Sequence, residues 1–233
     1  MQRDLDWGGC RNVRDLGGLP LPGGRSTAFG RVIRSDNPAR LDSAGWESLR
    51  SYGVRTVILL RTIGTDDPHP DPAPVPDGIS VEQVYLEDLT DAAFRRRCVD
   101  TDHWVTPLQW AEMLRHWPDR CAAALSAVVR AEPGGVVISC GIGRDRTGLV
   151  AFLLLALAGV PAAVIAEDWL HSFARLAGDP LAQGDMAMRV LQRSSRTAEQ
   201  AVDAALALDV PSRLLKGGLA TDDLATARTL LLP

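Results

Sequence analysis

The sequence predicts an α/β domain with a central, mainly parallel sheet flanked by helices and with a helical C-terminal third. Two observations support this fold class. Short apolar runs rich in β-branched residues alternate with segments of helical periodicity as far as residue 160, and the patterns after that point are helical. The chain has 233 residues, a length at which one sizeable core is the default. We therefore expect a single domain over residues 1–233, with a helical cap around residues 90–118.

The first half of the chain is expected to supply three strands and one regular helix. Residues 8–30 are rich in Gly and Pro, which favours turns and a short hairpin. Residues 43–52 have the apolar spacing of a helix, and Gly53 is placed to end it. Residues 66–78 contain five prolines and are expected to form a loop. The predicted strands are residues 31–35, 54–60 and 79–86.

The second half is expected to contain one more buried strand between helices. Residues 120–131 have a helical pattern, and residues 136–139 form a short apolar run typical of a buried strand. Helices are predicted over residues 147–157 and 162–176. The segment Cys140–Arg146 therefore joins the carboxyl end of a strand to the N-terminus of a helix.

Composition and charge exclude several classes of function. The net charge is −4, so nothing marks the chain as a nucleic-acid binder. No stretch is long and apolar enough to cross a bilayer, and we expect no stable membrane insertion. The opening MQRDLDWGG lacks the apolar core of a signal peptide, so we expect a cytoplasmic protein. The sequence leaves the oligomeric state open.

The chain has four cysteines, Cys10, Cys98, Cys121 and Cys140. None belongs to a C-x-x-C pair, and no His lies at zinc-ligand spacing from any of them. We therefore expect neither a metal nor another cofactor. Cys98 and Cys121 are expected to be small buried apolar residues. Only Cys140 is followed by Arg at the sixth position.

The segment CGIGRDR has the features of a phosphate-binding loop. Backbone N–H groups at the N-terminus of a helix attract anions, and the helix dipole adds to the attraction. The same surroundings lower the pKa of a thiol, which makes Cys140 a candidate nucleophile. Arg146 could bind two phosphate oxygens, and Thr147 could donate a hydrogen bond to the thiolate. The expected phosphate-binding residues are Gly141, Ile142, Gly143, Arg144, Asp145 and Arg146.

Blocks of the sequence resemble one family in order along the chain. SCGIGRDRTG resembles the HCxxGKDRTG signature of the bacterial tyrosine-phosphatase-like family, which includes mycobacterial and listerial tyrosine and lipid phosphatases of the cysteine-dependent phosphatase superfamily. The other similar blocks are NVRDLGGL, FGRVIRSDNPARL, GVRTVILLR, IAEDWLHS and, near the end, GLATDDLATARTLL. Together they cover nearly the whole chain.

The resemblance implies a protein-tyrosine-phosphatase-like fold and a metal-independent reaction through a phosphocysteine intermediate. Cys140 matches the family's nucleophile and Arg146 its phosphate-binding arginine. Asp145 matches a loop aspartate that is thought to assist catalysis, and Arg144 stands where the family has Lys.

Two positions depart from the family's pattern. Ser139 replaces a His that helps to order the loop, and Leu59 stands where the family strand usually has Asp. The change at Ser139 leaves open how readily Cys140 loses its proton.

The proton donor to the leaving group is left open between several aspartates. Asp145 is the first candidate, and Asp88, after the third predicted strand, is the alternative general acid. Asp119 lies in the triplet WPD, which many tyrosine phosphatases use, but it is close to Cys140 and in the first turn of a predicted helix. The remaining candidates are Asp91, Asp100 and Asp102.

These patterns predict a phosphate monoester hydrolase whose partner is a phosphorylated substrate. Phosphotyrosine protein or phosphoinositide is the substrate that the resemblance implies. A small phosphorylated metabolite or biosynthetic intermediate is the alternative, and a non-catalytic phosphate-binding module is the second alternative. Trp104, Trp110 and Trp117 could line a substrate pocket or pack in the core.

Overall fold

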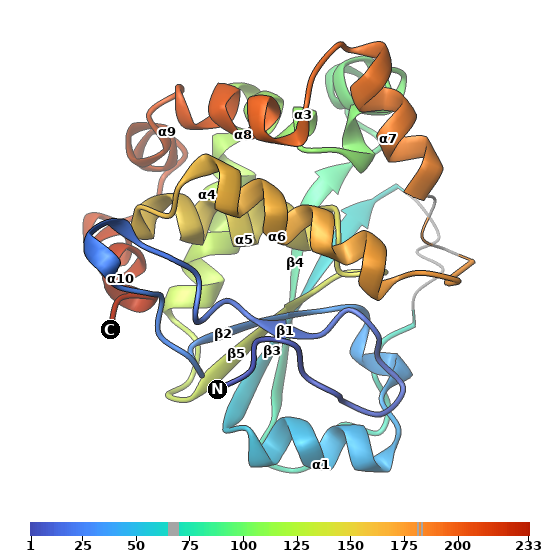
Figure 1. Cartoon of the computed structure of the whole chain (residues 1–233), viewed down its shortest axis with the longest axis vertical. Coiled ribbons are helices and arrows are strands. Elements are labelled where there is room, and N and C mark those ends of the chain that lie inside the picture. The colour runs from blue at the N-terminus through green and yellow to red at the C-terminus, as the bar shows by residue number, and fades with distance from the viewer. Residues whose placement is uncertain (65–69, 181, 183) are drawn as a thin grey trace.

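Figure 1 shows the computed structural model of the chain, which describes residues 1–64, 70–180, 182 and 184–233. Within these residues the strands form one sheet in the order β1-β2-β5-β3-β4. Neighbours among β2, β5, β3 and β4 run parallel, and β1 pairs with β2 in the antiparallel sense. The strands are β1 (Arg14–Asp15), β2 (Val32–Ser35), β3 (Val54–Ile63), β4 (Ser80–Asp88) and β5 (Gly135–Ser139). The carboxyl ends of the parallel strands therefore meet at one edge, where open α/β sheets bind ligands.

The α-helices follow the strands along the chain and dominate its C-terminal third. They are α1 (Ser43–Ser51), α2 (Ala92–Phe94), α3 (Leu108–His116), α4 (Pro118–Val129), α5 (Arg146–Ala158), α6 (Ala162–Arg175), α7 (Gly184–Arg193), α8 (Ala198–Leu206), α9 (Val210–Lys216) and α10 (Thr221–Leu230). Short helical turns lie at η1 (Pro22–Gly24), η2 (Pro38–Arg40), η3 (Arg95–Val99) and η4 (His103–Val105). In the described part of the chain, no helix combines the length and the apolar character that a membrane crossing requires.

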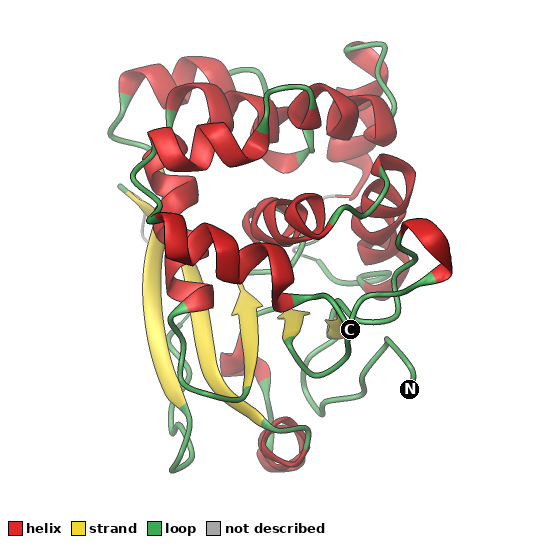
Figure 2. Ribbon diagram, turned by 90° about the vertical axis from the view of Figure 1, so that its left-hand side faces the viewer, coloured by secondary structure: helices red, strands yellow, loops and turns green. Residues whose placement is uncertain are grey.

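Helices cover the two faces of the sheet unequally (Figures 1 and 2). On one face α1 packs Trp46 and Leu49 against Val57 and Val137 of the sheet. On the other face α4 contacts β4, and α5 contacts β5 and β2. Helices α3, α8 and α9 pack on α4 and α6 and form a further layer outside them. The larger core therefore lies between the sheet and α5, on the side that carries most of the helices.

Helix α5 is surrounded by protein, and its N-terminus faces the carboxyl edge of the sheet. Every residue from Leu149 to Leu155 is buried, as expected of a helix that is apolar on all sides. In its first turn, a Cβ on Gly148 would lie 3.1 Å from Trp169 and 3.4 Å from Trp110. Glycine thus allows α6 and α3 to pack close to the start of this helix.

The structure confirms the predicted fold class and the helical C-terminal third, with two differences in the sheet. β3 continues to Ile63 because its pairing with β4 goes on beyond a bulge between Arg61 and Thr62. Residues Arg14–Asp15, expected within a region of turns and a short hairpin, add an antiparallel edge strand. In the predicted proline-rich loop, residues 66–69 lie outside the described residues, and residues 70–78 contain no helix or strand.

Residues 90–118 form short helices, as the sequence predicts. Trp110 is buried and stacks on Phe152, with 4.9 Å between the ring centroids, so it belongs to the core. Trp117 is also buried and donates its indole N–H to Asp91 at 2.7 Å. The cap role of this segment, and the single domain over residues 1–233, stay predictions.

Candidate active site

The segment Cys140–Asp145 connects β5 to α5 at the carboxyl edge of the sheet. Cys140 follows the last residue of β5 and is 7% exposed. Asp145 occupies the N-cap position of α5, and Arg146 is its first residue. The strand, loop and helix order predicted from the sequence is therefore present. The thiol lies where the helix dipole is positive.

Hydrogen bonds from outside the loop hold three consecutive carbonyls. Because carbonyl and N–H point in opposite directions across a trans peptide, each held carbonyl turns the next N–H to the other side of the loop. The carbonyl of Gly141 accepts from the backbone N–H of Asn37 at 3.2 Å, and that of Ile142 accepts from the side-chain amide of Asn12 at 2.9 Å. The carbonyl of Gly143 accepts from the guanidinium of Arg34 at 2.7 Å. The N–H groups of Ile142, Gly143 and Arg144 thus share one side of the loop, as an anion cradle requires.

Gly143 is required by the shape of the loop. Its φ of 68° lies in the left-handed region that favours glycine. A Cβ at this position would lie 2.4 Å from the carbonyl oxygen of Ser35, at the end of β2. Gly143 therefore lets the loop lie directly against the neighbouring strand.

Arg146 is oriented by groups from β3 and β4. One terminal nitrogen donates to the carbonyl of Leu60 at 3.0 Å, and Nε lies 3.6 Å from Glu87. Glu87 in turn accepts hydrogen bonds from Thr62 at 2.9 Å and Gln109 at 2.7 Å. Burial raises the pKa of this carboxyl, and the positive charge of Arg146 opposes the rise. Glu87 therefore fixes the arginine that the sequence assigns to phosphate binding.

Sequence reasoning missed Glu87 and the donors that hold the loop. Glu87 precedes Asp88 at the end of a predicted strand, and an acidic pair at that edge was the available signal. Asn12, Arg34 and Asn37 lie in blocks that show the family resemblance, but nothing in the sequence indicates that they hold the carbonyls of the loop.

Arg144 and Asp145 lie beside each other at the end of the loop, directly before α5. Arg144 donates from Nε to Asp145 at 2.9 Å and from Nη1 to the carbonyl of Ala182 at 2.5 Å. Its guanidinium also lies over the ring of Phe173, 5.1 Å from the centroid. The Arg144 side chain thus binds other groups of the protein. What Arg144 contributes to the anion cradle is its backbone N–H.

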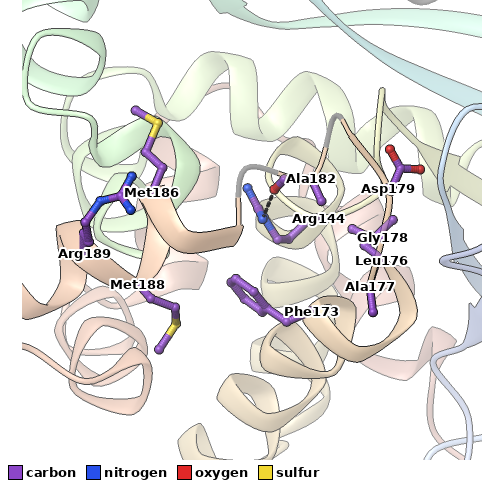
Figure 3. Close-up of a pocket in the computed structure, with 10 residues that line it drawn as sticks. All are labelled: Arg144, Phe173, Leu176, Ala177, Gly178, Asp179, Ala182, Met186, Met188 and Arg189. Atoms are coloured by element: carbon purple, nitrogen blue, oxygen red, sulfur yellow. Dashed lines mark hydrogen bonds between the residues drawn. The ribbon is translucent and has the colours of Figure 1, made fainter.

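A cavity of about 710 Å³ adjoins the loop at Arg144 (Figure 3). Figure 3 shows Arg144 reaching Ala182, with Phe173 on α6 beside it, and Met186 and Met188 on α7 pointing in opposite directions from that helix. Charged and apolar groups both line this space. It could therefore hold the organic part of a substrate, whereas none of the three tryptophans singled out in the sequence lines it.

Two of the other acid candidates, Asp88 and Asp91, hold local structure through their carboxylates. Asp88 accepts the backbone N–H of Thr90 at 2.8 Å and its hydroxyl at 2.6 Å, and the bond from this hydroxyl holds the Asp88 pKa below its usual range. Asp91 caps α2, and Asp119 stands in the first turn of α4. Asp88 and Asp91 therefore have structural tasks, whereas Asp145 belongs to the loop itself.

Two buried hydroxyls flank the loop. The side-chain oxygens of Ser139 and Thr147 have no hydrogen-bond partner among the described residues. The predicted bond from Thr147 to a Cys140 thiolate stays a prediction. The hydroxyl is free to make it.

The remaining cysteines have the surroundings of structural thiols. Burial raises the pKa of Cys98 and of Cys121 to about 12, and burial also raises that of Cys10. These three thiols are therefore protonated near neutral pH and are poor nucleophiles.

Comparison with known proteins places the chain among phosphatases, in agreement with the features of the loop. A family model described as the tyrosine phosphatase family matches residues 5–224. A protein of Cupriavidus necator named as a tyrosine-protein phosphatase is 32% identical, and the match covers 73% of this chain and 63% of that protein. The triple specificity protein phosphatase PtpB of Mycobacterium tuberculosis is 30% identical, with 85% of this chain and 79% of PtpB covered.

A third relative, a tyrosine-protein phosphatase of Nostoc commune, is 28% identical, with 68% of this chain and 54% of that protein covered. The chain thus spans less than two thirds of the Cupriavidus and Nostoc relatives. The family model, in contrast, runs through every strand and through the loop between β5 and α5. The chain belongs to the tyrosine phosphatase family.

Proposed function

We propose that this chain hydrolyses phosphate monoesters through a phosphocysteine intermediate formed on Cys140. The observation that carries the proposal is the loop whose carbonyls are held outward, with a cysteine at its start and Arg146 at its end. Membership in the tyrosine phosphatase family supports the same chemistry. The N–H groups of residues 141–146 and the guanidinium of Arg146 would hold the three non-bridging oxygens of the phosphate.

The reaction has two steps that balance. In the first, Sγ of the Cys140 thiolate bonds to phosphorus, the ester P–O bond breaks, and the leaving oxygen takes a proton from Asp145. In the second, a water oxygen attacks phosphorus and gives a proton to Asp145. The S–P bond then breaks, which releases inorganic phosphate and restores the thiolate. Positive charge from Arg146 and the backbone does the electrostatic work, so no step needs a metal.

The proposed substrate is a phosphotyrosine protein or a phosphoinositide. The cavity beside Arg144 supports a substrate with a large organic part, because Phe173, Met186 and Met188 supply apolar surface there. PtpB is named for triple specificity, which makes both classes worth testing on its relative. A small compact metabolite would leave this cavity unused.

The first experiment tests the chemistry. The purified protein should hydrolyse p-nitrophenyl phosphate in EDTA, and vanadate should inhibit it. Cys140→Ser should abolish turnover while it retains binding of a phosphorylated ligand, and Cys98→Ser is the matched control that keeps turnover. Activity that disappears in EDTA and returns with a divalent metal would exclude the cysteine mechanism. Phosphate binding without turnover would support the second alternative, a non-catalytic phosphate-binding module.

The second experiment tests the substrate class. A panel of phosphotyrosine peptides, phosphoinositide vesicles and small sugar phosphates is compared by kcat/KM on the same preparation. We expect the peptides or the vesicles to exceed the sugar phosphates, and Met188→Gln to lower kcat/KM for the preferred class without changing that for p-nitrophenyl phosphate. A preference for sugar phosphates would establish the metabolite alternative.

A further inference from the structure

A buried cluster of three arginines and one aspartate lies behind the phosphate-binding loop. Asp168 on α6 has a side chain that is 1% exposed. Its carboxylate contacts Arg3 at 2.6 Å, Arg14 at 3.0 Å and Arg34 at 2.5 Å. Arg14 and Arg34 are as buried as Asp168, with 0% and 1% exposed. Three guanidinium groups and one carboxylate leave two positive charges that are largely shielded from solvent.

Arg34 joins this cluster to the loop. While Nη1 contacts Asp168, Nη2 donates to the carbonyl of Gly143 at 2.7 Å and lies 3.4 Å from that of Arg144. A planar guanidinium that is fixed at one end presents its other end in a defined direction. The carboxylate of Asp168 therefore sets the position from which Arg34 holds the loop.

A second route leads from Asp168 to the preceding carbonyl. Arg14 donates to the side chain of Asp168 at 3.0 Å, to its backbone carbonyl at 2.6 Å and to the hydroxyl of Ser172 at 3.0 Å. Its Nη1 donates to Asn12 at 2.6 Å, and Asn12 donates to the carbonyl of Ile142 at 2.9 Å. Two of the three held carbonyls thus depend on one carboxylate.

Packing alone does not account for such a cluster. Burying charges costs free energy, and apolar residues of similar size often serve stability as well or better. The contacts instead run from Asp168 toward the loop. Arg14 and Arg34 each bind Asp168 with one part of the guanidinium, and with another part they bind Asn12 and the Gly143 carbonyl, respectively. Charge placed behind the loop is also weakly screened, because salt and water act mainly on exposed groups.

We propose that Asp168 is a positioning residue which, through Arg34, shapes the N–H cradle and aims a buried positive charge at the Cys140 thiolate and the bound phosphate. The inference rests on the proposed function of the loop. Arg34 supplies both shape and charge, and Asp168 supplies shape alone, because its own charge opposes binding of an anion. The two effects are therefore separable by substitution.

The experiment uses three variants of the full chain. Arg34→Lys keeps the charge and loses the two-ended contact, Arg34→Met loses both, and Asp168→Asn releases the anchor while it adds net positive charge. Vanadate affinity reports the shape of the cradle, and the pH midpoint of Cys140 alkylation by iodoacetamide reports the charge. Val202→Ala, a cavity in the buried core of α8, is the control for lost stability.

All three variants should bind vanadate about tenfold more weakly or worse, a size typical of losing one hydrogen bond that involves a charged group. The alkylation midpoint should rise clearly only in Arg34→Met, stay near the wild-type value in Arg34→Lys, and not rise in Asp168→Asn. Asp168→Glu should recover part of the vanadate affinity. No merely structural role predicts this sign pattern.

Two results would overturn the inference. Vanadate affinity in Arg34→Lys and Asp168→Asn that falls no further than in Val202→Ala would mean that the cluster only stabilises the fold. An alkylation midpoint that rises equally in all three variants would mean that loop disorder, not charge, controls the thiol. If the wild type neither hydrolyses p-nitrophenyl phosphate nor binds vanadate, the proposed function itself fails, and the inference falls with it.

Discussion

Asp145 and Asp88 are the two carboxylates between which the sequence leaves the proton donor open. Asp145 contacts Arg144, its neighbour in the loop, and 19% of its side chain is exposed at the start of α5. Asp88 instead holds the turn at Thr90, and the hydrogen bond from the Thr90 hydroxyl keeps its pKa low. A group that stays ionised is a poor acid at neutral pH, which counts against Asp88. Asp145 stays the proposed donor because it belongs to the loop that carries Cys140 and Arg146.

Asp145→Asn should slow hydrolysis of an alkyl phosphate far more than that of p-nitrophenyl phosphate, because a good leaving group needs little protonation. General acid catalysis accounts for about 10²–10⁴-fold in rate, so the ratio of the two losses should be large. Asp88→Asn is the matched control, and its ratio should stay near one. Steady-state kcat values on the two substrates give both ratios. The assignment is wrong if the ratios are reversed.

At the level of single residues, the sequence predicts groups that lie together in the chain. Cys140 and Arg146 share one short loop, and both were predicted from its composition and its place between a strand and a helix. Glu87 was missed because it reaches Arg146 only through the pairing of β4 with β3. The direction of the Arg144 side chain depends on Ala182 and Phe173, which no local pattern relates to the loop.

The loop and the helix that follows it tolerate a methyl group differently. Gly143→Ala places a side chain on left-handed backbone, which costs about 1–2 kcal/mol, and also drives it against the Ser35 carbonyl. Gly148→Ala brings its methyl group to 3.1 Å from Trp169 and 3.4 Å from Trp110, so the Trp169 side chain must shift by a few tenths of an ångström, while the helix gains about 1 kcal/mol of propensity.

Gly143→Ala should therefore lose vanadate binding and turnover, and Gly148→Ala, which needs only a small shift of a side chain, should lose far less of both. Isothermal titration with vanadate and thermal unfolding of the two variants side by side provide the comparison. A Gly143→Ala protein that binds vanadate normally would show that the loop does not need its left-handed residue.

At the level of elements, periodicity predicts what is long enough to show a period. The helices α4, α5 and α6 and the strands β3, β4 and β5 were predicted within a few residues of their observed ends. β1 contains two residues, too few for any alternation, and it exists because Arg14 and Asp15 pair with β2. The packing of α3 against α8 likewise depends on tertiary contact and has no signature in either segment.

The cluster around Asp168 joins the N-terminal segment and β2 to α6. Arg3 and Arg14 come from the N-terminal segment, Arg34 from β2 and Asp168 from α6. Burial alone would raise the pKa of Asp168, but the charges of Arg14, Arg34 and Arg3 outweigh it and hold the pKa far below its usual range. The carboxylate therefore stabilises the fold wherever it would be ionised in the unfolded chain, and that stability is lost as the pH falls toward its native pKa.

Asp168→Asn should accordingly lower Tm near pH 7, since breaking a buried ion pair costs about 3–5 kcal/mol, or roughly 10 °C for a chain of this size. The difference in Tm between Asp168→Asn and wild type should stay constant down to about pH 5. It should narrow below about pH 4, where Asp168 would be protonated in the unfolded chain. Thermal unfolding followed by circular dichroism across this range measures the gap. Asp203→Asn, at an exposed position of α8, should show no such gap. A gap that keeps its size near pH 3 would contradict the assignment.

The donors that hold the loop also determine when the loop acquires its shape as the chain folds. Asn12 and Arg34 lie 130 and 109 residues from the carbonyls they hold. Contacts of such separation close large loops of chain, as the pairing of β2 with β5 also does, and are expected to form after the local helices. Phosphate would consequently bind only at the end of folding, so an oxyanion added during refolding should slow unfolding and leave the folding rate nearly unchanged. Binding of an anion therefore indicates that the whole chain has folded, and not only that the loop has formed.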